Sequence, residues 1–407
     1  ADCGIGKGPM QMEWASKQPH DCIIAAPLAV AHQFVREAEK FGIDLAYAKD
    51  QSQITKRITV TNYERLENFH IEQFGAVALD ESSILKNSAG AYCNWMIEAF
   101  KNTPFRLCSS ATPAPNDVME LGTQAEFLGV MTRGEMLAMY FTHDGGDTSK
   151  WRVKGHAQAA FWSWMASWAV MIRKPSDLGY SDEGFVLPPL HMHERCVTVN
   201  QASSGFLFAV EALTLQERQS ARRDSIADRV AACAEIVNQS DAPFLVWCNL
   251  NDESEALAAA IPDAVEVRGS DTDAHKEKAI AGFLDGSIRV IVSKPRIMGL
   301  GLNFQHCADM AYVGLSDSYE QLYQSIRRCW RFGQTKPVNV YVITAATAGA
   351  VGSNIQRKER PTKETDNNMI EHMKDLNAAA LHGGSARNKT DYAPQKALSI
   401  PNWLEAA

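Results

Sequence analysis

Short apolar runs alternate with segments of helical periodicity along most of this chain, and the series occurs twice. Such runs are typical of strands buried on both faces, and the segments between them place apolar residues on one face of a helix. Strands are predicted at 22–26, 57–61, 76–79 and 105–109 in the first series, and at 244–248, 264–267, 288–293, 310–313 and 338–343 in the second. Strands that alternate with helices favour parallel sheets, whose ligands bind beyond the carboxyl ends of the strands.

The two series predict two domains. At 407 residues the chain is too long for one ordinary core. We expect a first domain over residues 1–129, an insertion and linker over 130–189, a second domain over 190–350 and a polar tail over 351–407 with a short helix. Ala1 lies in a predicted loop, so we also expect that a segment before it is missing from the sequence.

The predicted insertion is rich in aromatic residues. Phe161, Trp164, Met165 and Trp168 share one face of a predicted helix. Such a stripe can stack on nucleic-acid bases, but core packing is the favoured interpretation. The segment is also basic, with charges at Arg152, Lys154, Arg173 and Lys174. It ends at Leu187-Pro188-Pro189, a stiff linker.

Composition limits the classes of function. The formal net charge of −8 argues against a protein coated with nucleic acid, although a local basic cleft remains compatible with it. The nine cysteines form no C-x-x-C pair, which indicates reduced thiols in a cytoplasm-like compartment and neither a disulfide framework nor a zinc site. The sequence shows no signal peptide and no apolar run of membrane-spanning length, so we expect no membrane partner.

Residues 4–8 follow the spacing of a phosphate-binding loop. Gly4 and Gly6 would let backbone N–H groups wrap phosphate oxygens, and Lys7 would reach the outer phosphates where the next helix begins. Gly8 stands where such loops carry a Ser or Thr hydroxyl for magnesium, and no strand precedes the loop in this sequence. Taken alone, the segment also fits a glycine-rich chain end.

Adjacent carboxylates, Asp80 and Glu81, follow the predicted strand at 76–79. At that end of a parallel sheet they would face the same crevice as the phosphate-binding loop. Asp80 could hold magnesium, and Glu81 could orient or deprotonate an attacking water. The alternative is a helix N-cap followed by solvated acids. A second strand end leads into Ser110-Ala111-Thr112-Pro113, which is either a tight loop or a segment that couples nucleotide state to the neighbouring domain.

The second series ends in a stretch of arginines and glutamines. Gln324 and Gln334 bracket Arg328 and Arg331, which lie three residues apart near the end of a predicted helix and can point toward one spot. Fixed guanidinium forks suit a polyphosphate that is undergoing transfer. An exposed basic helix end is the plainer interpretation of this spacing alone.

Taken together, these segments resemble the motifs of superfamily 2 helicase-like ATPases of the DEAD/DEAH kind, specifically the Swi/Snf-like branch and its bacteriophage-encoded members. The similar segments are residues 4–7, 26–28, 61–63, 80–83, 110–113, 299–303 and 324–334, and they stand in the order that the family has. Gly8 and the pair Cys329-Trp330 depart from the family pattern, and the first departure bears directly on catalysis.

The resemblance implies an α/β fold of two RecA-like parallel-sheet domains in tandem, with a mostly helical insertion and ATP and Mg²⁺ bound between the domains. It implies catalytic roles for Asp80, Glu81, Gln324, Arg328 and Arg331, with Arg331 as the arginine finger and Asp80 as the metal ligand. Further residues would bind the nucleotide, namely Gly4, Gly6, Lys7, Gly8 and Gly301. Nucleic-acid contacts are implied at Pro27, Thr61, Asn62, Lys294 and Asn303.

The implied activity is that of an ATP-dependent helicase or translocase on nucleic acid, with DNA preferred and RNA open. Bacteriophage replication or recombination proteins are further candidate partners, in which case the chain would work in the host cytoplasm. A second hypothesis is a helicase-shaped clamp whose hydrolysis is impaired at Gly8. A third is a subunit associated with a nuclease or with recombination, in which the basic aromatic insertion docks a partner.

Overall fold

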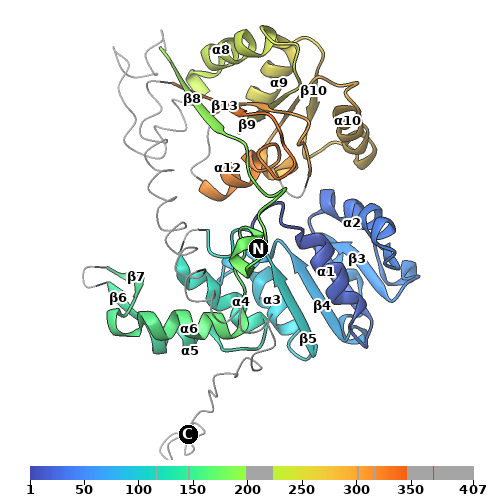
Figure 1. Cartoon of the computed structure of the whole chain (residues 1–407), viewed down its shortest axis with the longest axis vertical. Coiled ribbons are helices and arrows are strands. Elements are labelled where there is room, and N and C mark those ends of the chain that lie inside the picture. The colour runs from blue at the N-terminus through green and yellow to red at the C-terminus, as the bar shows by residue number, and fades with distance from the viewer. Residues whose placement is uncertain are drawn as a thin grey trace, which may run out of the picture.

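The computed structural model describes residues 1–115, 117–144, 147–198, 223–299, 302–314, 318–345 and 370. Two α/β domains lie one above the other, and the N-terminus lies between them (Figure 1). Each domain is built on a parallel sheet with helices on its faces, which confirms the predicted fold class of two RecA-like domains.

The first domain contains a five-stranded sheet in the order β2-β3-β1-β4-β5. Its strands are β1 (Cys22–Ala26), β2 (Leu45–Tyr47), β3 (Ile58–Asn62), β4 (Ala76–Asp80) and β5 (Phe105–Ser109). Its helices include α1 (Lys7–Ser16), α2 (Leu28–Phe41), α3 (Ala91–Ala99) and α4 (Leu121–Phe127). Alternate residues of β1 belong to different cores, because Ile24 packs with α1 and α2 whereas Ile23 packs with α3. This burial on both faces explains the continuous apolar runs.

The second domain contains a six-stranded sheet in the order β10-β11-β9-β12-β13-β8. Its strands are β8 (Leu190–Val197), β9 (Phe244–Cys248), β10 (Ala264–Val267), β11 (Val290–Ser293), β12 (Asp309–Val313) and β13 (Val338–Ala345). Its described helices are α8 (Ile226–Asn238), α9 (Asn251–Ala260), α10 (Asp273–Asp285), α11 (Pro295–Met298) and α12 (Tyr319–Ile326). The buried pair Arg229–Glu253 joins α8 to α9 at 2.7 Å, and Glu253 also accepts hydrogen bonds from the backbone of Asn249 and Leu250.

Two strands of the parallel sheets were not predicted from the sequence, and neither were the two strands of a hairpin in the insertion. The short strand β2 has three residues, too few to show a period. The edge strand β8 follows the Pro188-Pro189 linker and pairs with β13, and six of its eight residues are exposed, so its sequence lacks the continuous apolar run of a buried strand.

The insertion forms a separate layer beside the first domain (Figure 1). It consists of α5 (Arg133–Tyr140), a hairpin of β6 (Phe141–Asp144) and β7 (Asp147–Val153), and α6 (Gln158–Trp168). Phe161, Trp164 and Met165 of α6 are buried in a core shared with α4 and α5, and Trp168 packs against it. The interpretation of the aromatic stripe as core is therefore confirmed.

The tail predicted over 351–407, including its helix, lies outside the described residues except for residue 370. Within the described part of the chain, no helix combines the length and the apolar character that crossing a membrane requires.

Candidate functional site

The loop before α1 has the backbone of a phosphate cradle. Gly4 and Gly6 adopt left-handed φ values of 87° and 93°, which a residue with a Cβ adopts only with strain. Gly6 is the N-cap of α1, and no side chain caps this end. The first N–H groups of the helix are therefore free of side-chain acceptors, and they carry the positive end of the helix dipole.

Lys7 and Gly8 open α1. The Nζ atom of Lys7 donates to the carbonyl oxygens of Ala1 and Asp2, each at 3.2 Å, so the lysine folds back over the loop. A Cβ on Gly8 would lie 3.2 Å from Oε2 of Glu37, a residue of α2. The space that a Ser or Thr side chain would enter therefore borders a carboxylate.

Asp80 ends β4 and is buried at 9 % exposure. The side-chain amide of Gln11 donates to its Oδ1 at 2.6 Å. The pKa of the Asp80 carboxyl is raised to about 6, chiefly because burial disfavours the charged form and then because Glu81 adds negative charge. The Gln11 amide and the cations Lys7 and Arg328 lower the same pKa.

This shift predicts a pH-dependent effect on stability. Because the folded-state pKa lies above the ordinary value of 3.8, the stability that Asp80 contributes is present below that value and is lost as the pH rises through about 6. Asparagine cannot ionise. The free energy of unfolding of Asp80→Asn, relative to that of the wild type, should therefore rise by up to about 3 kcal/mol between about pH 4 and pH 7. Urea unfolding at both pH values measures the gain, and exposed Asp44→Asn is the control. A difference that does not change with pH would contradict the assignment.

Glu81 follows Asp80 in a left-handed conformation with a φ of 62°, one of two such non-glycine residues in the described chain. Its Oε1 accepts hydrogen bonds from the hydroxyls of Ser110 at 2.5 Å and Ser83 at 3.2 Å. A strained backbone that is held in this way is typical of a functional position. The predicted alternative, a simple N-cap, does not fit, because the Glu81 side chain accepts no hydrogen bond as a cap.

Arg328 and Arg331 follow α12 in the second domain. Arg328 donates from Nε to the carbonyl of Gln324 at 2.9 Å and from Nη1 to the carbonyl of Leu302 at 3.0 Å. Arg331 donates from Nη1 to the same Leu302 oxygen at 3.2 Å. Burial and then the charge of Arg328 lower the pKa of Arg331 to about 10, so the guanidinium stays charged at neutral pH. The two forks are held side by side.

One cleft collects these groups from both domains. Its lining from the first domain includes Lys7, Asp80 and Glu81, and its lining from the second domain includes Arg328 and Arg331. Gly4, Gly6 and Gly8 also border it, as do Gln33 and Glu37 of α2. Gly301, the remaining residue predicted to bind nucleotide, lies outside the described residues. The structure thus brings together in one place residues that are more than three hundred positions apart in the sequence.

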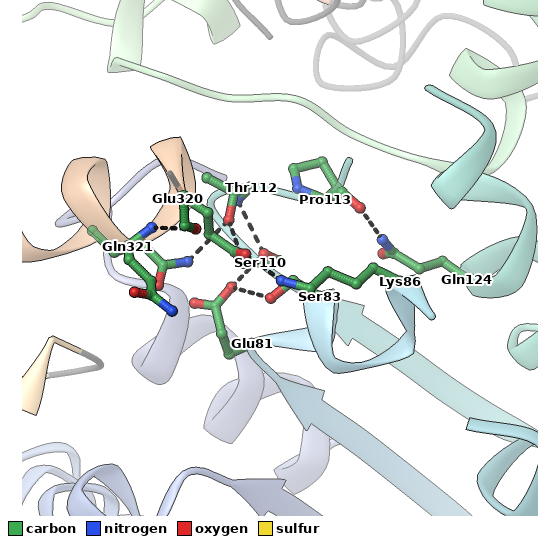
Figure 2. A network of polar contacts seen from close by, with 11 residues as sticks. Glu81, Ser83, Lys86, Ser110, Thr112, Pro113, Gln124, Glu320 and Gln321 are labelled. Atoms are coloured by element: carbon green, nitrogen blue, oxygen red, sulfur yellow. Dashed lines mark hydrogen bonds and ion pairs between the residues drawn. The ribbon is translucent and has the colours of Figure 1, made fainter. Parts of the chain in front are cut away.

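Gln324 lies elsewhere. Its amide donates to the hydroxyl of Thr112 at 2.9 Å, and it borders a second cavity of about 390 Å³ between the domains rather than the phosphate cleft. Thr112 belongs to the predicted coupling loop, and Ser110 of that loop contacts Glu81 (Figure 2). These contacts favour the coupling interpretation of the loop over an isolated tight turn.

Asp2 and Arg327 form a contact between the domains that the sequence patterns did not indicate. Arg327 is 1 % exposed and lies 3.3 Å from the carboxylate of Asp2, and it donates to the carbonyl of Cys3. The hydroxyl of Tyr323 donates to Asp2 at 2.7 Å. The start of the phosphate loop is therefore attached to the arginine segment of the second domain.

The predicted nucleic-acid contacts divide into two groups. Thr61 is fully buried in β3, and Asn62 is 4 % exposed and bonded to Tyr47 and Glu64, so neither side chain is presented to a polyanion. Pro27 borders both clefts between the domains. Partly exposed residues are Lys294, which donates to Asn251, and Asn303, which accepts from the backbone of Gln305.

The residues of the phosphate cleft fit a nucleoside triphosphate, and they supply part of the coordination that its metal ion needs. Free N–H groups, Lys7 and two arginines match the phosphates. No cluster of three His, Cys, Asp or Glu side chains that would suit a metal occurs among the described residues. Magnesium would be held by Asp80 together with phosphate oxygens and water, which is a common arrangement for this ion.

Comparisons with known proteins agree with this architecture. Residues 228–333 match the family model described as the helicase conserved C-terminal domain. The TATA-binding protein-associated factor mot1 of Schizosaccharomyces pombe is 30 % identical over 129 residues, which span 30 % of this chain and 6 % of that protein. The structure of S. cerevisiae Dbp5 bound to RNA and ADP BeF3 has a TM-score of 0.56 at 11 % identity, covering 92 % of this chain and 88 % of that one. The chain is therefore similar in its fold to the structure of Dbp5 and, over residues 228–333, similar in its sequence to the helicase conserved C-terminal domain.

Proposed function

We propose that this chain is a nucleic-acid-stimulated ATPase that moves along DNA or remodels it, and that it is a Swi/Snf-like member of superfamily 2 similar to those of bacteriophages. The observation that carries the proposal is the cleft shared by Lys7, Asp80, Glu81, Arg328 and Arg331. Phosphate-binding, metal-binding and transition-state groups meet there, and they come from two domains.

The division of the site between domains gives the mechanism. ATP with magnesium supplies the transferable phosphoryl group. Lys7 and the N–H groups of α1 bind the phosphates, and Asp80 holds the metal ion. Glu81, fixed by Ser110, orients the attacking water and takes its proton. Arg331 stabilises charge on the transferring group, and because it belongs to the second domain, turnover requires the domains to close.

DNA is proposed over RNA because of the sequence similarity. The relative at 30 % identity is a TATA-binding protein-associated factor, whereas the structure bound to RNA matches at 11 % identity, which supports the fold alone. We expect ATP turnover to rise when duplex or single-stranded DNA is added, and to rise less with RNA of the same length. Turnover that stays at its basal rate with both nucleic acids would contradict the proposal.

The second candidate is a clamp that binds nucleic acid without turnover, and Gly8 favours it. The loop lacks the hydroxyl that usually binds magnesium, and Oε2 of Glu37 borders the space that such a side chain would enter. The two candidates differ in the effect of Gly8→Thr, with Gly8→Ala as the control that adds a Cβ without a hydroxyl.

If the ATPase proposal is right, the wild type is active and Gly8→Thr changes turnover by less than about tenfold, because Asp80 and the phosphates already hold the metal ion. An inactive wild type that gains about a hundredfold in Gly8→Thr, and not in Gly8→Ala, supports the clamp instead. Steady-state ATP hydrolysis with saturating DNA measures both outcomes.

A further inference from the structure

Glu320 of α12 makes contacts across the domain boundary that the phosphate cleft does not explain. Its carboxylate forms an ion pair with Lys86 of the first domain and accepts a hydrogen bond from the Thr112 hydroxyl at 3.3 Å. Figure 2 shows the three side chains converging between the two domains. Glu320 is 7 % exposed, so it is nearly inaccessible to solvent although it is charged.

The contacts continue from Glu320 to the catalytic carboxylate. The Thr112 hydroxyl donates to Glu320, and the Thr112 backbone N–H donates to Oγ of Ser110 at 3.0 Å. Ser110 in turn donates to Glu81 at 2.5 Å. Thr112 and Ser110 therefore join the second domain to Glu81: Thr112 donates from its hydroxyl to Glu320 and from its backbone N–H to Ser110, and the Ser110 hydroxyl accepts that bond and donates to Glu81.

The electrostatics of Glu320 make this contact selective for one arrangement of the domains. A carboxylate that is removed from water requires a partner charge and hydrogen bonds. Both partners of Glu320, Lys86 and Thr112, belong to the first domain. When the domains separate, the carboxylate loses both partners and is hydrated again, and the Thr112 hydroxyl loses its acceptor. Gln324 donates to the same Thr112 hydroxyl and strengthens the link from the second domain.

We infer that Glu320 is a positioning residue: by binding Lys86 and Thr112 only when the domains are together, it fixes Ser110 and hence the Glu81 carboxylate for attack. The inference rests on the proposed ATPase function. Neither Lys86 nor Glu320 borders the phosphate cleft; both border the second cavity between the domains. Their loss should therefore slow the chemical step and leave nucleotide binding intact.

The test compares Glu320→Gln, Lys86→Met and the double variant with wild type. The control is Glu277→Gln. This variant removes a different contact between the domains, the exposed pair that Glu277 forms with His32 at 3.5 Å. We expect kcat for DNA-stimulated ATP hydrolysis to fall about tenfold or more in each single variant, and the double variant to lose little more, because the two residues act as one unit. The KM for ATP should change by less than about twofold, since uniform binding is untouched.

Hydrogen exchange of the nucleotide-free protein gives a readout that does not depend on turnover. Amides of residues 81–83 and 110–112 should exchange faster in Glu320→Gln than in wild type or in Glu277→Gln. Unchanged kcat in an active enzyme, or unchanged exchange at these amides, overturns the inference and leaves the proposed function standing. A wild type without ATP turnover overturns the proposed function, and the exchange result alone then decides whether Glu320 orders the Glu81 segment.

Discussion

Replacing Arg331 with alanine is expected to reduce DNA-stimulated ATP turnover by about a thousandfold to a hundred-thousandfold, the range known for arginine fingers. The expectation follows from its position, because Arg331 borders the cleft with Lys7 and Asp80 but belongs to the other domain. Its charge is needed only while negative charge develops on the transferring phosphoryl group, so kcat should fall more than the affinity for ATP.

The folded state should tolerate the change. Arg331 shares the carbonyl oxygen of Leu302 with Arg328, and its pKa of about 10 reflects burial and the neighbouring cation, so removing it relieves repulsion. Arg331→Lys should recover little activity, because an ammonium lacks the planar fork. Arg195→Ala, which removes an exposed arginine paired with Glu235, is the control. Turnover within about tenfold of wild type in Arg331→Ala would exclude the finger role.

The sequence pattern predicted the fold well where local rules dominate. Strands such as β1 and β9 were predicted residue for residue, because a buried parallel strand is a continuous apolar run that ends at a turn. Strand β8 was not, because its pairing with β13 is made through the backbone while its side chains face solvent. Backbone pairing leaves no mark in side-chain hydropathy.

The site was predicted in part, because some of its residues belong to local sequence patterns. Lys7, Asp80, Glu81, Arg328 and Arg331 occur in local patterns whose chemistry can be named, and the structure gathers them in one cleft. Their roles remain predictions, and the Glu81 and Arg331 variants test two of them.

Contacts between residues that lie far apart in the sequence were not predicted. Asp2 and Arg327 pair across 325 positions, and Glu320 meets Lys86 across 234, so neither contact follows from spacing. Gln324 was assigned to the reacting centre, and the structure places its amide on Thr112 instead. A motif identifies which residues act together, whereas only the packing of the domains shows which atom each one contacts.

Replacing Glu81 with glutamine is expected to lower turnover by about a hundredfold to ten-thousandfold, the usual contribution of a general base. Glutamine has the same shape and can still accept the hydrogen bonds from Ser110 and Ser83, so the left-handed backbone and the link to Thr112 should persist. What it loses is the capacity to take a proton from water. Nucleotide binding should therefore remain near wild type, which equilibrium titration with a fluorescent ATP analogue measures.

Comparison with Glu320→Gln then distinguishes the role of Glu81 as general base from the role of Glu320 as positioning residue. Glu81→Gln should slow the chemical step by at least about a hundredfold while leaving amide exchange at residues 110–112 unchanged, whereas Glu320→Gln should slow the step and speed the exchange. Exposed Glu72→Gln, at the surface of the same domain, is the control. Full turnover in Glu81→Gln would mean that the attacking water is activated elsewhere, and Asp80, the other carboxylate in the cleft from β4, would be the first group to examine.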